Sequence, residues 1–240
     1  MTTYSDKNIV DSWLQNAKPW IVAIRANEIE SRSLVTNKAI IDTILKKEPK
    51  TVLDIGCGEG WLARELNNSG ISTLGIDVVP ELVEVANKEG GGIFRLVSYD
   101  DLTQGVIKEK FDVIVCNFSL LGNESVINIF KYIPHMLNNH GYFIIQTIHP
   151  ITGCGNVNYE DGWRKGSWSG FSDDFTNPPP WYFRTLETWK ALFRLSGIEL
   201  SEILEPLNPQ NDEAASVIFI GKLAANKLSN LTGENYAPSS

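Results

Sequence analysis

The residues whose types and spacing could do chemistry begin with a glycine-rich turn. Asp54 ends an apolar run and is followed by Gly56, Gly58 and Gly60, with Cys57 between the first two glycines. Glycine permits a positive φ and lets a ligand approach the main chain without meeting a Cβ atom. A buried strand that leads into such a turn and then into a helix is typical of nucleotide-binding sites. We therefore expect ligand binding here, with the small Cys57 chosen for packing rather than as a nucleophile.

The same turn lacks the two common phosphate-binding patterns. The dinucleotide fingerprint G-x-G-x-x-G needs a glycine at position 61, where this chain has Trp61. An indole there would crowd a pyrophosphate at the start of the helix. The pattern G-x-x-x-x-G-K-[ST] is absent as well. The spacing therefore disfavours an NAD-dependent oxidoreductase, which stays as an alternative.

A second acidic residue, Asp77, ends the next strand-like run, about twenty residues beyond the turn. A carboxylate at this position can accept hydrogen bonds from both hydroxyls of a ribose. A ribose-binding acid without phosphate-binding apparatus predicts an adenosine-like ligand.

Strand-like runs that alternate with helical segments must position these residues. Strands are expected at 51–55, 72–76, 92–97, 111–116 and 142–148, and later at 200–204 and 215–222. Helical spacing marks segments such as 123–137 and 186–195. This alternation indicates an α/β fold with a mainly parallel sheet.

We expect one domain over 1–240. Its parts are N-terminal helices forming a lid (1–47), a cofactor-binding core (48–149), a cap insertion (150–184), a C-terminal helix and strands (185–223) and a flexible tail (224–240). A loop as long as 150–184 is usually functional or disordered, and its many aromatic residues argue against disorder. The cap residues expected to face a substrate are Tyr159, Trp163, Trp168, Trp181 and Tyr182.

Asp54, the three glycines and Asp77 together resemble the class I S-adenosylmethionine-dependent methyltransferases, whose first motif is an acid-x-Gly-x-Gly-x-Gly turn. The similarity extends over roughly 50–222. It implies a Rossmann-like, mainly parallel seven-stranded sheet with helices on both faces. It also implies S-adenosyl-L-methionine as cofactor and S-adenosyl-L-homocysteine as product.

The resemblance assigns roles to single residues. It implies that the turn from Gly56 to Gly60 passes the methionine and ribose moieties, that Asp77 binds the ribose hydroxyls and that Val78 lines the adenine. Tyr99 would offer its backbone amide to the adenine edge, and Asn117 would contact the methionine part through its carbonyl.

Two further assignments follow from the resemblance. Relatives often carry at the position of Ser98 an acid that accepts from the adenine amino group, and here Asp100 or Asp101 is the substitute. Arg32 lies in the N-terminal segment that covers the cofactor in relatives, and it is a candidate partner for the methionine carboxylate. The alternative for Arg32 is an ordinary surface arginine.

The second half of the chain resembles a looser subset of these enzymes, mostly without a characterised substrate. Its marks are His149-Pro150-Ile151 after the fifth strand and the helix from Arg184 to Trp189. His149 is the histidine expected at a strand's carboxyl end, so we predict it as the catalytic base for a hydroxyl acceptor. The alternative is that His149 only hydrogen-bonds a loop before Pro150.

Composition narrows the partners. The chain has 29 Asp and Glu against 21 Lys and Arg, a net charge of −8, which disfavours nucleic acid and anionic membranes as partners. Asn177-Pro178-Pro179-Pro180-Trp181 is similar to a motif of enzymes that methylate adenine in nucleic acid. It does not follow the fourth strand as that motif does, so we interpret it as a rigid proline turn.

The three cysteines lack a metal-binding or disulfide spacing, so no metal site and a cytoplasmic location are expected. An oligomer is possible but cannot be read from these patterns. The predicted function is methyl transfer to a small-molecule acceptor by in-line displacement. A non-catalytic subunit that binds the same cofactor and activates a partner is the alternative.

Overall fold

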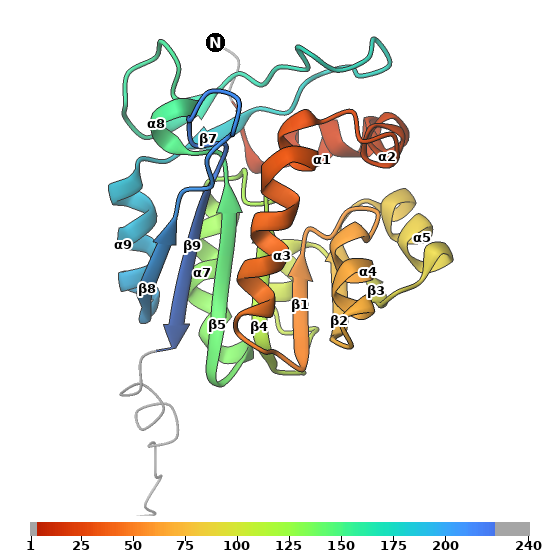
Figure 1. The fold of residues 1–240 in the computed structure, drawn as a ribbon, viewed down its shortest axis with the longest axis vertical. Helices are drawn as coiled ribbons and strands as arrows, with labels where there is room; N and C mark the ends of the chain where they lie inside the picture. The colour runs from red at the N-terminus through yellow and green to blue at the C-terminus, as the bar shows by residue number, and fades with distance from the viewer. Residues whose placement is uncertain (1–3, 224–240) are drawn as a thin grey trace, which may run out of the picture.

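The computed structural model describes residues 4–223, so the predicted tail at 224–240 lies outside the described residues. Within them the chain forms a three-layer α/β fold (Figure 1). The main sheet contains β1 (Thr51–Ile55), β2 (Ser72–Asp77), β3 (Ile93–Leu96), β4 (Phe111–Asn117), β5 (Leu137–Thr147), β8 (Ile198–Leu204) and β9 (Val217–Leu223).

The strand order is β3-β2-β1-β4-β5-β9-β8. β1 to β5 pair in parallel, whereas β9 pairs antiparallel with both β5 and β8. The predicted Rossmann-like, mainly parallel seven-stranded sheet is thus confirmed. Because parallel strands buried on both faces need apolar residues at nearly every position, the central strands consist almost entirely of buried residues.

Helices cover both faces of this sheet. On one face lie α3 (Asn37–Leu45), α4 (Trp61–Asn68) and α5 (Pro80–Glu89), and on the other α6 (Tyr99–Thr103), α7 (Glu124–Met136) and α9 (Leu186–Ser196). In Figure 1, α3 stands in front of the sheet and α7 behind it. Ile40 and Ile44 of α3 are fully buried against the sheet, so α3 belongs to the covering layer. Of the segment 1–47 that was predicted as a lid, only the part before α3 is therefore placed to cover a site.

That first part consists of α1 (Asp6–Gln15) and α2 (Ala17–Arg25). A short π-helix, η1 (Arg32–Thr36), joins them to α3. α1 and α2 lie across the carboxyl ends of the strands (Figure 1). The insertion holds α8 (Pro150–Gly153) and a separate two-stranded sheet of β6 (Gly162–Arg164) and β7 (Trp181–Phe183).

Candidate functional site

A cavity of about 590 Å³ lies at the carboxyl ends of β1, β2 and β4, beneath α1 and α2. This is where ligands bind in open parallel sheets, and the volume is in the usual range for a small-molecule site. Most of the residues predicted to bind a cofactor line it, namely Arg32, Gly56, Cys57, Gly58, Asp77, Val78, Ser98, Tyr99 and Asn117. Asp54 and Gly60 do not.

The glycine turn is folded tightly against the next strand. The amides of Gly56 and Cys57 both donate to the carbonyl of Ile76, at 2.8 and 3.0 Å. Gly56 and Gly58 have φ of +77° and +56°, a region that side chains rarely adopt. A Cβ atom at Gly56 would collide with Ser119, whereas at Gly58 the nearest atom would be Trp20 Nε1, 3.8 Å away. Because Gly58 has no side chain, the space between its backbone and Trp20 stays open as part of the cavity.

Gly60 serves packing instead of ligand contact. A Cβ atom there would lie 2.7 Å from the ring of Phe94, beneath the start of α4. Its φ of +87° also requires glycine. The third glycine of the turn thus lets α4 approach the sheet closely.

Asp77 is held at the cavity wall by the backbone. Its Oδ2 accepts from the amide of Gly58 at 2.9 Å, and its Oδ1 accepts from the amide of Val79 at 3.0 Å. Burial raises the pKa of Asp77, and these amide bonds oppose that rise. Each carboxylate oxygen keeps a further lone pair for a hydroxyl donor. Asp77 is therefore fixed in place and able to accept two more hydrogen bonds.

Asp54 lies behind the turn, with only 2% of its surface exposed. Burial and the neighbouring Asp77 raise its pKa to about 7, and the positive charge of Arg32 opposes the shift. Its position at the end of β1 was predicted, but it does not touch the cavity.

Arg32 is a partly buried cation at the opposite wall. Its guanidinium lies 4.8 Å from the centre of the Trp61 ring and 5.9 Å from that of Trp20. Its Nε donates to Asn37 at 3.2 Å, but the buried Nη2 has no partner among the described residues. Burial lowers its pKa to about 10. A buried guanidinium nitrogen without a partner is costly, so an anionic ligand group fits here.

Two residues at this wall were missed as site residues in the sequence. In the sequence, Trp61 was used only as an argument against a bound pyrophosphate. In the structure, its ring forms a cation–π contact with the Arg32 guanidinium. Glu59, 1% exposed, lines the cavity and forms an ion pair with Arg64 at 2.5 Å. The sequence feature that could have indicated Glu59 as a site residue is its position between Gly58 and Gly60 in the glycine turn.

The predicted adenine end is formed by Val78, Ser98 and Tyr99, together with Asp100. Ser98 caps α6 by accepting from the amide of Asp101, and the Asp101 carboxylate accepts in return from Ser98. Asp101 does not line the cavity, which leaves Asp100 as the acid available there. The Tyr99 hydroxyl donates to the carbonyl of Ser119 at 2.9 Å, and burial raises its pKa.

At the end of β4, Asn117 lines the cavity. Its side-chain Oδ1 is buried and has no hydrogen-bond partner within the described residues. An orphaned acceptor of this kind favours a donor group on a ligand. The sequence had predicted a contact through the backbone carbonyl of Asn117, and the side chain is an additional acceptor.

The remaining wall of the cavity comes from α1 and the first turns of α7. Apolar Val10, Trp13 and Leu121 lie beside polar groups such as Glu124 and Asn128. Asp6 joins the two helices, since its carboxylate accepts from the amides of Asn123 and Ser125 at 2.8 and 2.7 Å. These amides open the first turn of α7, where a carboxylate is favourable.

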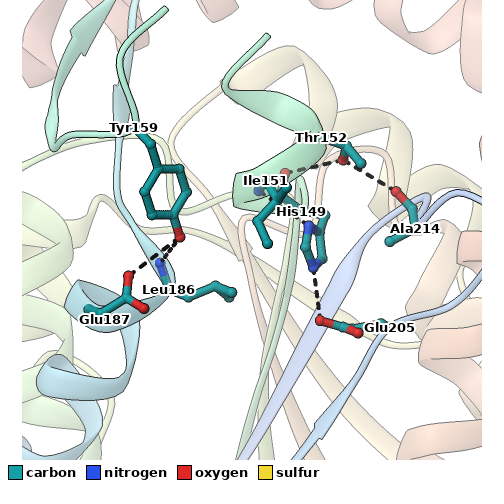
Figure 2. A network of polar contacts seen from close by, with 8 residues as sticks. All are labelled: His149, Ile151, Thr152, Tyr159, Leu186, Glu187, Glu205 and Ala214. Carbon is teal, nitrogen blue, oxygen red and sulfur yellow. Dashed lines mark hydrogen bonds and ion pairs between the residues drawn. The ribbon is translucent and has the colours of Figure 1, made fainter.

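His149 is not at this cavity, contrary to the prediction. Its Nδ1 accepts from the amide of Ile151 at 3.3 Å, and its Nε2 lies 3.0 Å from a carboxylate oxygen of Glu205 (Figure 2). Only 4% of His149 is exposed. With Nδ1 as acceptor, the ring proton sits on Nε2 and is donated to Glu205. This geometry matches the alternative in which His149 secures the loop at Pro150, where α8 begins.

The predicted cap residues also lie outside the cavity lining. The Tyr159 hydroxyl accepts from the amide of Leu186 at the start of α9 (Figure 2). Trp163 contacts the ring of Tyr182, and Trp181 that of Phe183. Trp168 packs edge-on against Trp13 at 5.7 Å between ring centres. Trp168 therefore packs the insertion against the lid helices, whereas Trp163 and Trp181 pack against rings of the insertion itself.

Between residues 4 and 223, no group of three or more His, Cys, Asp or Glu side chains is placed to hold a metal ion. No helix in the described part is long and apolar enough to cross a membrane. Burial raises the pKa of Cys57 well above the ordinary thiol value, so it is a poor nucleophile.

Comparison with known proteins agrees with the site. Residues 31–203 match the family model described as a methyltransferase domain. A ubiquinone biosynthesis O-methyltransferase from Actinobacillus pleuropneumoniae is 33% identical over 108 residues, which is 42% of this chain and 46% of that protein. The chain thus matches about half the length of this relative.

Solved structures share the fold. The magnesium protoporphyrin IX methyltransferase of Synechocystis PCC 6803, solved with bound S-adenosylmethionine, has a TM-score of 0.62 at 14% identity, covering 93% of this chain and 100% of that one. An S-adenosylmethionine-dependent methyltransferase from Mesorhizobium loti has a TM-score of 0.60 at 18% identity, covering 77% and 96%. The family match covers well over half of the chain and includes the whole glycine turn and Asp77. The chain therefore belongs to the methyltransferase domain family.

Proposed function

We propose that the protein transfers a methyl group from S-adenosylmethionine to a small-molecule acceptor. The observation that carries this proposal is the cavity itself, where the glycine turn, Asp77 and the buried guanidinium of Arg32 meet. A ribose fits the free lone pairs of Asp77. The carboxylate of an amino acid fits the unpartnered Nη2 of Arg32. Membership of the methyltransferase domain family supports the same assignment.

The bound cofactor would supply an electrophilic methyl group. The residues of this chain would then do three things. Asp77 and the backbone at Gly58 bind the ribose and hold it against β2. Arg32 orients the amino-acid end. α1 and α2 exclude water, which strengthens the polar interactions beneath them.

The acceptor would lie between α1 and the first turns of α7, close to Asn117. Holding the acceptor atom in line with the methyl group at about 3–3.5 Å supplies much of the rate, and no covalent enzyme intermediate is needed. Among the described residues, no histidine lines the cavity. The proposed mechanism relies on proximity and orientation, and His149 keeps its role in the loop.

Calorimetric titration with S-adenosylhomocysteine and with adenosine tests this proposal. Asp77→Asn removes the carboxylate that would accept from ribose, so both ligands should bind at least tenfold more weakly, since charged hydrogen bonds contribute about 1.5–3 kcal/mol each. Arg32→Met should weaken S-adenosylhomocysteine by a similar factor but leave adenosine unchanged, because adenosine has no carboxylate.

Arg25→Met is the matched control. Arg25 forms an exposed ion pair with Glu89 at 2.8 Å and does not line the cavity. Removal of its charge should leave both affinities unchanged. Binding of NAD in place of S-adenosylhomocysteine, or equal loss of adenosine binding in Arg32→Met, would refute the assignment.

A further inference from the structure

The insertion at 150–184 contacts the lid helices through hydrogen bonds of Ser12 and Asn16, and the Asn16 amide is the fully buried one. Asn16, between α1 and α2, has no exposed surface. Its Nδ2 donates to the carbonyl of Thr176 at 2.7 Å, and its Oδ1 accepts from the amide of Thr176 at 2.9 Å. Nδ2 also donates to the carbonyl of Ser12 at 2.8 Å. The side chain of Asn16 therefore pairs with a backbone unit of the insertion as a neighbouring strand would.

Aromatic side chains surround this pair. Trp168 donates from Nε1 to the carbonyl of Thr176 at 3.0 Å. This carbonyl therefore accepts one hydrogen bond from Asn16 and one from the insertion itself. Trp168 contacts Trp13 of α1 edge-on, and Phe171 contacts Trp20 of α2 with 6.3 Å between ring centres. In Figure 1 the insertion runs above α1 and α2. We define the lid seam as Asn16, Thr176 and these four rings.

The same two tryptophans of α1 and α2 also face the cavity. Trp13 and Trp20 both line the cavity, and they stand three residues before and four residues after Asn16. Trp13 and Trp20 also pack with Val78 and Val79, next to the proposed ribose acid. The rings thus have the insertion on one side and the cavity on the other.

We propose that Asn16 is a positioning residue for ligand binding, and that the insertion acts through it as an external brace on the lid. No residue of the insertion lines the cavity. It fixes Trp13 and Trp20, and these rings close the cavity. This inference rests on the proposed function, because its effect is measured as binding of S-adenosylhomocysteine.

A braced lid has a measurable consequence. If the seam is broken, the closed lid is populated only part of the time, and apparent affinity falls by that fraction. We expect Asn16→Ala to bind S-adenosylhomocysteine about tenfold more weakly. Asn16→Asp should be no better, because it keeps the acceptor for the Thr176 amide but turns a carboxylate toward the Thr176 carbonyl.

Hydrogen exchange of the full chain with and without S-adenosylhomocysteine distinguishes a brace from a merely stabilising contact. In the unmodified protein, the ligand should slow exchange in residues 6–25 and in residues 166–178 together, although the latter do not line the cavity. In Asn16→Ala the ligand should still slow exchange in the glycine turn but no longer in 166–178.

Gln15→Ala is the control beside the seam. The Gln15 side chain accepts from Asn177 Nδ2 at 2.8 Å in an exposed contact and does not line the cavity, so its loss should leave affinity and coupled protection intact. If Asn16→Ala does not fold, Trp168→Leu tests the seam from the insertion side and should give the same loss of affinity and coupling. Unchanged affinity in the folded Asn16 variant, or in Trp168→Leu, overturns the brace alone. Absence of S-adenosylhomocysteine binding by the unmodified protein overturns the proposed function as well.

Discussion

Asp54 should make the protein less stable as the pH rises, and Asp54→Asn should remove this effect. Its pKa is raised from 3.8 to about 7, chiefly by burial and then by the neighbouring Asp77. The folded state therefore holds a proton that the unfolded state releases. The stabilising contribution of that proton is complete below pH 3.8 and is lost as the pH rises through about 7.

The difference between a pKa of 3.8 and one of about 7 corresponds to about 4 kcal/mol of folding free energy in total. Asparagine has nearly the same shape as aspartate and does not ionise. The free energy of unfolding of Asp54→Asn, relative to the unmodified protein, should thus rise by about 3 kcal/mol between pH 5 and pH 8. Urea unfolding at four values of pH across this range measures the difference, in which pH effects of other groups cancel.

Asp112→Asn is the control, because the fold lowers the pKa of Asp112 whereas it raises the pKa of Asp54. Burial works to raise the pKa of Asp112, but hydrogen bonds from Asn138 and from the amides of Lys50 and Thr51 together outweigh it and lower that pKa. Asp112 is therefore ionised in both states above pH 5, so its substitution should cost a constant amount from pH 5 to pH 8. A difference for Asp54→Asn that is equally flat would show that Asp54 ionises normally in the fold and would refute the reasoning.

Two further predictions concern the turn and the loop. Gly56→Ala should lower the free energy of unfolding by more than about 2 kcal/mol, because strain at positive φ adds to a collision with Ser119. Gly58→Ala should cost only about 1–2 kcal/mol yet weaken S-adenosylhomocysteine at least tenfold, since its methyl group would enter the cavity. Urea unfolding measures the loss of stability and calorimetry measures the loss of affinity. Equal losses of stability in Gly56→Ala and Gly58→Ala, or unchanged affinity in Gly58→Ala, would contradict these predictions. His149→Ala should lower stability by about 1–3 kcal/mol through loss of the Glu205 bond and the α8 cap while S-adenosylhomocysteine affinity holds. A fall in affinity without a change in stability would return His149 to the site.

The sequence predicted the parts of the fold that depend on local pattern. The alternation of β-branched runs and helical spacing predicted the parallel sheet, and each predicted strand from 51–55 to 215–222 lies within two residues of an observed one, except that β5 begins earlier, at Leu137. Gly56, Gly58 and Asp77 were predicted because their backbone and spacing requirements are local. The direction of a side chain at the end of a strand is not local.

His149 shows why such directions could not be predicted. Its carboxyl-end position was predicted, but the turn at Pro150 and the carboxylate of Glu205, 56 residues away in sequence, decide where its ring points. The insertion gives the same lesson. Its aromatic composition predicted burial, and Trp168 and Phe171 are half-buried against Phe175 of the insertion. They also contact rings of α1 and α2, about 150 residues earlier in the chain, which no local pattern could predict.

The two ends of the cavity are held by different kinds of structure, and this difference bears on how the protein would choose its acceptor. Backbone hydrogen bonds of the sheet fix the cofactor end, where Ile76 anchors the glycine turn and Gly58 anchors Asp77. The acceptor end is held by contacts between separate helices, such as Asp6 of α1 on the first turn of α7. A methyl donor needs one fixed position, whereas acceptors differ in shape. Under the proposed function, acceptor choice therefore resides in α1 and the first turns of α7, and the insertion influences it only by holding α1 in place through Asn16.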